Sequence, residues 1–134
     1  MWIKEETSKK VDELKELIST FEDQRVDFWD EDECEYMWNG EELETYHLKI
    51  FNGSAWYYDD EVIIESIYIE DDQLYFDAQW NAYNYKGNVC GDEKMNHLDA
   101  EFIVQRFWEE SQENAFIESL EFFISLLKGE IELE

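Results

Sequence analysis

The stretch from Asp59 to Trp80, DDEVIIESIYIEDDQLYFDAQW, constrains the fold more than any other part of the chain. Its second half alternates with a period of two, which is typical of a half-buried strand, and one face carries Leu74, Phe76, Ala78 and Trp80. Its first half is apolar on both faces between Val62 and Ile69, which is typical of a central strand covered on each side. The stretch therefore predicts two long strands joined by an acidic turn at residues 70–72.

An amphipathic helix is predicted before this strand pair, from Ile3 to Phe21. Apolar side chains recur there at helical spacing, and Glu5 and Glu6 suit the positive end of a helix dipole. Five of the ten basic residues of the chain lie on this helix or just after it: Lys4, Lys9, Lys10, Lys15 and Arg25.

The segment between the helix and the strand pair contains two tight-turn signals. Residues 27–38 mix acids and aromatics without a consistent period, so we expect a loop that leads into a short strand. Asn39-Gly40 predicts a turn, and the weak alternation from Glu42 to Phe51 predicts a strand. Asn52-Gly53 predicts a second turn, which would make residues 42–51 and 54–58 a hairpin.

After the strand pair, residues 82–90 predict a last, edge-like strand that ends at Gly91. Asn96 or Asp99 is then expected to cap a helix that carries Leu98, Phe102, Ile103 and Phe107. Helical spacing predicts a final helix through Phe116, Leu120, Phe123 and Leu127, which ends at Lys128-Gly129. No Gly or Pro lies between these helices at residues 109–111, so one kinked helix is an alternative.

These elements predict a single acidic α+β domain over residues 1–134. Its order is an N-terminal helix, an antiparallel meander of four to five strands, and two C-terminal helices packed on one face of the sheet. Six Trp, eight Tyr and nine Phe provide a core that a disordered acidic tail would lack.

Charge sets the main limit on function. The chain has 36 acidic and ten basic residues, a net charge of −26. Residues 1–25 have five basic and seven acidic residues, so nearly all of the negative charge belongs to the remaining part. A protein of this charge is repelled by nucleic acid and by anionic membranes, which excludes direct binding to either.

The two cysteines and the N-terminus suggest an intracellular protein. Cys34 and Cys90 lack CxxC spacing, and we expect buried apolar thiols, with a disulfide as the alternative. The first residues turn charged at once and no run of 18 apolar residues follows, so neither a signal peptide nor a membrane span is predicted. We expect a cytoplasmic location.

Catalytic motifs are absent: the chain has no GxGxxG, GxxxxGK[ST], GxSxG or HExxH. A Cys–His nucleophile would have to pair Cys34 with His47 or Cys90 with His97, and the spacing of these four residues does not match a structural zinc site. The acidic run 30–33 lacks the glycine of an EF-hand loop. We therefore expect no cofactor, no catalytic residue and no dedicated metal site, and keep a divalent-metal site built from paired carboxylates as an alternative.

Three explanations of the charge compete: solubility, adaptation to high salt, and imitation of a nucleic-acid backbone. A charge of −26 exceeds the magnitude of about 2–8 that suffices for solubility of a small domain. Glu outnumbers Asp 24 to 12, whereas a salt-adapted surface would be expected to favour Asp. Carboxylates on a strand recur at roughly 6.6 Å on each face, which suits a groove that neutralises phosphates.

In charge and size the chain resembles DNA-mimic inhibitors, small acidic proteins that phages and mobile elements use against restriction or CRISPR nucleases. The resemblance implies a non-enzymatic inhibitor that binds a positively charged nucleic-acid-binding protein, such as a host nuclease. An immunity protein that neutralises a nuclease toxin is the alternative.

The predicted partner-binding residues are the acidic clusters and two tryptophans interleaved with them. Either tryptophan could instead pack beneath the sheet, whereas exposed Trp side chains are common energetic anchors at interfaces. The set comprises Asp27, Trp29, Asp30, Glu31, Asp32, Glu33, Glu35, Trp38, Glu41, Glu42, Glu44, Asp59, Asp60, Glu61, Glu70, Asp71 and Asp72.

Overall fold

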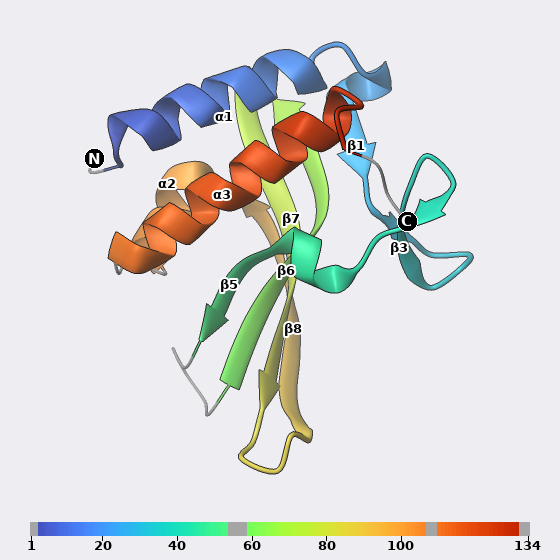
Figure 1. Cartoon of the computed structure of the whole chain (residues 1–134), viewed down its shortest axis with the longest axis vertical. Helices are drawn as coiled ribbons and strands as arrows, with labels where there is room; N and C mark the ends of the chain where they lie inside the picture. The colour runs from blue at the N-terminus through green and yellow to red at the C-terminus, as the bar shows by residue number, and fades with distance from the viewer. Residues whose placement is uncertain (1–2, 54–58, 107–109, 132–134) are drawn as a thin grey trace.

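The computed structural model describes residues 3–53, 59–106 and 110–131, and these form an α+β fold with the predicted order of elements (Figure 1). Helix α1 (Glu5–Ile18) precedes the strands, and helices α2 (Ala100–Arg106) and α3 (Glu110–Leu127) follow them. Helices α1 and α3 lie side by side across one face of the main sheet, while the lower ends of the strands extend beyond them (Figure 1).

The main sheet is antiparallel and is built on the predicted strand pair. Strands β6 (Asp59–Glu70) and β7 (Gln73–Tyr83) pair along their whole lengths, and the order of the sheet is β1-β6-β7-β8. Strands β1 (Arg25–Asp27) and β5 (Lys49–Gly53) both pair with β6, which makes β6 central, as its apolar residues predicted. The turn of Asp71 and Asp72 has positive φ at both residues (50° and 63°), a conformation that Asp tolerates.

The core lies between the main sheet and the helices. Leu74, Phe76 and Ala78 of β7 are buried, which confirms the predicted face of that strand. On the helix side, the buried residues are Leu14 and Ile18 of α1 and Phe116, Leu120 and Phe123 of α3. Burying each large apolar side chain contributes roughly 1.5–3 kcal/mol, which offsets the self-repulsion of a strongly acidic chain.

The helix ends follow local capping chemistry. Asp99 caps α2, because its Oδ1 accepts the N–H of Phe102 at 2.7 Å, whereas the other predicted cap, Asn96, lies in strand β8. Helix α3 ends at Leu127, and Gly129 follows with φ at 74°. Helix α1 is shorter than predicted because tight backbone turns follow Ile18.

Two strand boundaries were predicted wrongly in the middle of the chain. Residues 42–51 are not one strand, because a 3₁₀ helix, η2 (Thr45–Leu48), separates β4 (Glu41–Glu42) from β5. This turn allows both Leu43 and Leu48 to be buried. Asn52-Gly53 is not a turn, because both residues pair with β6, and residues 54–58 lie outside the described residues.

The last strand also differs from the prediction. Ala82 and Tyr83 end β7, and β8 (Val89–Leu98) begins only after the turn 84–88. The carboxamide of Asn84 makes this turn, since its Oδ1 accepts the N–H groups of Lys86 (2.9 Å) and Asn88 (3.1 Å). Leu98 therefore belongs to β8, not to a helix.

A second, small antiparallel sheet projects from the right-hand side of Figure 1. It consists of β2 (Trp29–Asp30), β3 (Glu35–Trp38) and β4. The predicted turn at Asn39-Gly40 joins β3 to β4 and has positive φ at both residues (51° and 81°).

The cysteines are not buried, contrary to the expectation from sequence. Cys34 and Cys90 are both exposed and both are free thiols. Cys34 lies in the turn before β3 with φ at 54°, and Cys90 lies near the start of β8, so neither position faces the core.

Candidate acidic partner-binding surface

The small sheet and its turns gather two of the predicted acidic clusters. We call residues 29–44 the small acidic sheet. Strand pairing places Asp30 opposite Glu35, and Trp38 opposite Glu41. The clusters at 27–35 and 41–44 are thus neighbours in space. The carboxylates of the small acidic sheet are Asp30, Glu31, Asp32, Glu33, Glu35, Glu41, Glu42 and Glu44.

Asp30 shapes the turn that carries most of these acids. Its Oδ1 accepts the backbone N–H groups of Asp32 (2.9 Å) and Glu33 (3.1 Å). This arrangement is an Asx turn, in which a carboxylate replaces a backbone acceptor. The side chains of Glu31, Asp32 and Glu33 are left exposed on the outside of the turn.

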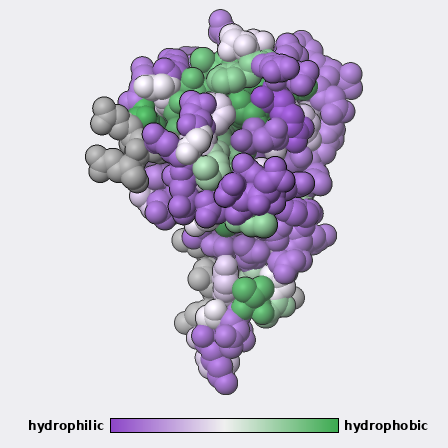
Figure 2. Space-filling model, turned by 90° about the vertical axis from the view of Figure 1, so that its right-hand side faces the viewer, coloured by the Kyte–Doolittle hydropathy of each residue, from purple (hydrophilic) through white to green (hydrophobic). Residues whose placement is uncertain are grey.

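Within the part of the chain that the structure describes, no ion pair neutralises the carboxylates of the small acidic sheet. All except the half-buried Asp30 are exposed. Within the described residues, no Lys or Arg nitrogen lies within 4.0 Å of any of these carboxylates. The side of the molecule that carries the small acidic sheet faces the viewer in Figure 2 and is largely hydrophilic. It is a concentrated negative surface that is open to an approaching cation.

Three other predicted residues are already paired with a Lys or Arg side chain. Asp27 accepts hydrogen bonds from Arg25 Nε (2.8 Å) and from the hydroxyl of Ser66 (2.7 Å). Glu61 forms an ion pair with Lys49 at 2.9 Å. Binding a partner at these sites would have to compete with contacts that the fold already makes.

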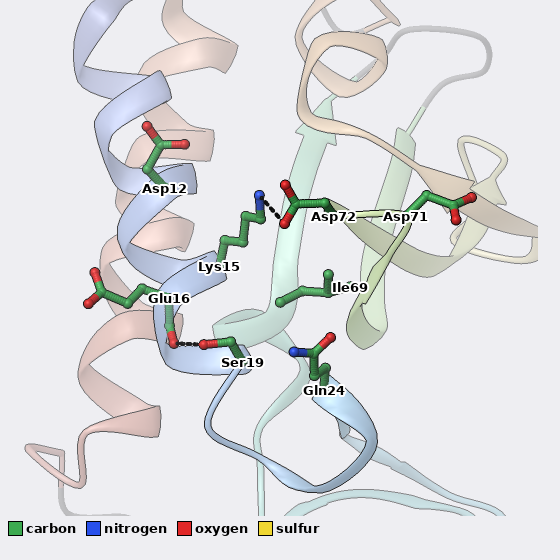
Figure 3. Close-up of a pocket in the computed structure, with 8 residues that line it drawn as sticks. All are labelled: Asp12, Lys15, Glu16, Ser19, Gln24, Ile69, Asp71 and Asp72. Carbon is green, nitrogen blue, oxygen red and sulfur yellow. Dashed lines mark hydrogen bonds and ion pairs between the residues drawn. The ribbon is translucent and has the colours of Figure 1, made fainter.

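The third paired residue, Asp72, lies at an open hollow between α1 and the β6–β7 turn (Figure 3). Lys15 points across this hollow of about 470 Å³ to Asp72, at 3.2 Å. Asp71 and Asp12 also line it, and among the described residues Ile69 is its only apolar lining residue. Small-molecule sites are mostly apolar, so this hollow is not built like one.

The remaining predicted acids lie along β6. Asp60 is fully buried and accepts a hydrogen bond from Trp80 Nε1 at 2.8 Å, so its carboxylate is not exposed on the surface. Asp59 begins β6, opposite Tyr83. Glu70 and Asp71 are exposed at the other end of that strand.

The two predicted tryptophans lie in strands of the small acidic sheet, Trp29 in β2 and Trp38 in β3, and both make contacts within the protein. Trp38 packs edge-to-face against Phe21 and Phe28, with ring centroids at 5.8 and 5.7 Å, so the packing alternative is correct for it. Trp29 is half-buried, contacts Tyr36 at 4.9 Å and lies under the ammonium of Lys94 at 5.9 Å.

Sequence reasoning missed the polar junction that connects the two sheets. Glu65 is buried in β6, and Lys94 Nζ contacts both of its carboxylate oxygens at 2.6 Å. Burial, together with the charges of Glu65 and Glu61, raises the pKa of Tyr36, so its phenol stays protonated and hydrogen-bonds Glu65. A lone Glu within an apolar strand was the available signal.

A second missed cluster crosses the outer face of the main sheet. The hydroxyl of Tyr68 donates to Asp77 Oδ1 at 2.8 Å, and the backbone N–H of His97 donates to the same oxygen at 2.9 Å. The imidazole of His97 stacks on Tyr75, with centroids at 3.8 Å. Burial and Asp77 raise the pKa of Tyr68, so the phenol is kept as a donor. These bonds fasten β6, β7 and β8 together.

The histidines do not assemble the nucleophilic or metal-binding sets considered from sequence. His47 lies between the rings of Tyr46 and Phe122, and Cys34 Sγ contacts the carbonyl of Glu31 at 3.5 Å. In residues 3–53, 59–106 and 110–131, no three His, Cys, Asp or Glu side chains are grouped so as to hold a metal ion.

Glu61 provides a test of the ion pairs on the main sheet. Burial alone would raise its pKa, but hydrogen bonds from Asn81, Lys49 and Tyr83 outweigh burial and lower it. A carboxylate with a lowered pKa stabilises the fold above its unfolded pKa, near 4.5, and this contribution is lost as pH falls through the folded value.

We therefore expect Glu61→Gln to reduce the stability difference between neutral pH and acid. The measurement is the free energy of unfolding by urea, for both proteins, at pH values from neutral to below 4.5. The gap between wild type and variant should narrow as pH falls below 4.5. A gap that stays constant with pH would contradict this role of Glu61.

Comparisons with known proteins add no identification: no family model, curated protein or solved structure matches the chain. Among the described helices, none is long and apolar enough to cross a membrane.

Proposed function

We propose that this protein is a non-enzymatic inhibitor that binds a basic nucleic-acid-binding protein in the cytoplasm and occupies its groove. The small acidic sheet is the primary contact. An anti-defence protein of a phage or mobile element, directed against a CRISPR or restriction nuclease, is the form that fits best.

The main support for this proposal is the distribution of the few Lys and Arg residues in the chain. Lys15, Arg25, Lys49 and Lys94 each pair with a carboxylate on or beside the main sheet. The small acidic sheet has no such counter-charge among the described residues. Holding like charges together costs free energy, and a basic partner would recover that cost on binding.

The geometry of the surface supports imitation of phosphates. Carboxylates are carried on a folded frame whose turn is fixed by Asp30, so the charges are preorganised when the partner arrives. A duplex presents about one negative charge per 1.7 Å of axis, and Lys or Arg side chains that neutralise phosphates can bind carboxylates with the same hydrogen bonds.

The compactness of the small acidic sheet favours one alternative. Its unpaired acids lie within residues 29–44, a patch suited to a single active site, which is the arrangement expected of an immunity protein against a nuclease toxin. The two functions differ in the target, and competition by DNA separates them. If the target is a groove that binds long duplexes, long DNA should displace this protein from it more strongly than short DNA does.

The test is a pull-down with tagged protein from nuclease-treated lysate of candidate hosts. We expect a DNA- or RNA-binding protein to be retained at low salt, eluted at high salt and displaced by added duplex DNA. All three results are expected because the proposed interface is electrostatic.

A partner that resists both high salt and DNA would overturn the proposal, because its interface would be apolar. The control bait carries lysines in place of the exposed acids of the small acidic sheet and should retain no such protein.

A further inference from the structure

Resting on the proposed function, we propose that Tyr46 is the aromatic anchor of the acidic interface and receives an arginine side chain of the basic partner. The predicted anchors, Trp29 and Trp38, are committed to contacts within the protein. Tyr46, in contrast, is 66 % exposed and follows the small acidic sheet directly in the chain.

The ring of Tyr46 contacts the ring of His47, which is itself packed against other rings. Its centroid lies 4.1 Å from that of His47, which stacks on Phe122 at 4.9 Å and 15°. Phe122 contacts Phe123, and Phe123 stacks on Phe28 in the core. A column of rings thus runs from the core to an exposed tyrosine, and the contact with His47 favours one orientation of the Tyr46 ring before binding.

The imidazole of His47 is held in this column by its ring contacts, while its backbone N–H donates to the carbonyl of Glu44 at 3.1 Å. Its Nδ1 is buried and has no hydrogen-bond partner within the described part of the chain. The hydroxyl of Ser119 in α3 donates to the carbonyl of Lys49 at 2.9 Å, which fixes α3 against the residue after η2. The surface around Tyr46 is therefore formed by two elements, η2 and α3, which are joined by the hydrogen bond from Ser119 to Lys49, the residue after η2.

Charge complementarity selects the occupant. Glu41, Glu42 and Glu44 are exposed just before Tyr46, and Glu118 is exposed one helical turn before Phe122. An exposed aromatic ring that follows exposed carboxylates in the chain fits a guanidinium, because that group is planar, stacks on rings and binds a carboxylate through two parallel hydrogen bonds. Lysine can satisfy the charge but not the stacking geometry.

The test compares an oligoarginine peptide with an oligolysine peptide of equal length, by titration calorimetry at physiological salt. We expect the wild type to bind oligoarginine more tightly, by about three- to thirtyfold. Tyr46→Ala should remove this preference to within about twofold while leaving oligolysine affinity unchanged, since every carboxylate is retained.

Two further variants act as controls. Tyr46→Phe keeps the ring and should keep the preference. Tyr85→Ala removes another exposed tyrosine (74 % exposed), whose ring lies near the protein's own Lys86, and should also keep it. A preference that survives Tyr46→Ala, or that Tyr85→Ala abolishes equally, overturns the role of Tyr46 while the proposed function stands. Failure of both peptides to bind the wild type would overturn the proposed function itself.

Discussion

Replacing Glu31, Asp32, Glu33 and Glu35 with lysine is expected to abolish binding of the basic partner, with affinity falling at least about a hundredfold. The four side chains are exposed and unpaired, so each substitution turns an attraction into a repulsion at the centre of the proposed contact. Asp30 is retained because it holds the turn through two backbone hydrogen bonds. The measurement is retention in the pull-down described above, followed by titration with the purified partner.

A matched variant separates this local effect from total charge. Lysines at Asp12, Asp92, Glu93 and Glu101 also replace four exposed acids, and they change the net charge by the same amount. We expect this control to bind within about threefold of wild type, mostly through a slower association rate. Equal losses in the two variants would mean that net charge, and not the small acidic sheet, drives binding.

Periodicity predicted the parts of the fold where one physical pattern dominates. The strand pair at 59–80 and the apolar faces of α1 and α3 were predicted correctly. Their apolar side chains follow the strand or helix period because they pack against one core. The edge strand was misplaced because the side chain of Asn84 closes a turn where the Tyr- and Asn-rich composition suggested a strand. Turn chemistry of this kind overrides a weak period.

Only part of the candidate site could be predicted from the sequence, because the sequence does not show which acidic side chains are paired within the fold. Asp60 and Glu61 stand in an acidic run as dense as that of Glu41 and Glu42, yet Asp60 is buried under Trp80 and Glu61 is tied to Lys49. Pairings of this kind join residues far apart in the chain, so they depend on the tertiary fold. The small acidic sheet emerges as distinct only after those cations have been assigned.

The same core that supports the main sheet also supports the proposed anchor, because Phe123 connects the two. Phe28 stacks on Phe123 and also contacts Trp38 of the small acidic sheet, while Phe122 contacts both Phe123 and His47, which contacts Tyr46. Loss of Phe123 should therefore loosen both regions together.

Phe123→Ala is expected to lower the free energy of unfolding by about 3–5 kcal/mol, a large share of the 5–15 kcal/mol typical of a domain. The ring is fully buried, so its removal leaves a cavity among packed aromatics. Urea unfolding at fixed salt measures the change, since screening alters self-repulsion. Phe102→Ala makes the same chemical change at a side chain that is 42 % exposed and should cost under about 1 kcal/mol. Equal losses of unfolding free energy in the two variants would contradict this role. The buried ring of Phe123 would then contribute no more to stability than the exposed ring of Phe102, and Phe123 would not connect the core to the acidic surface.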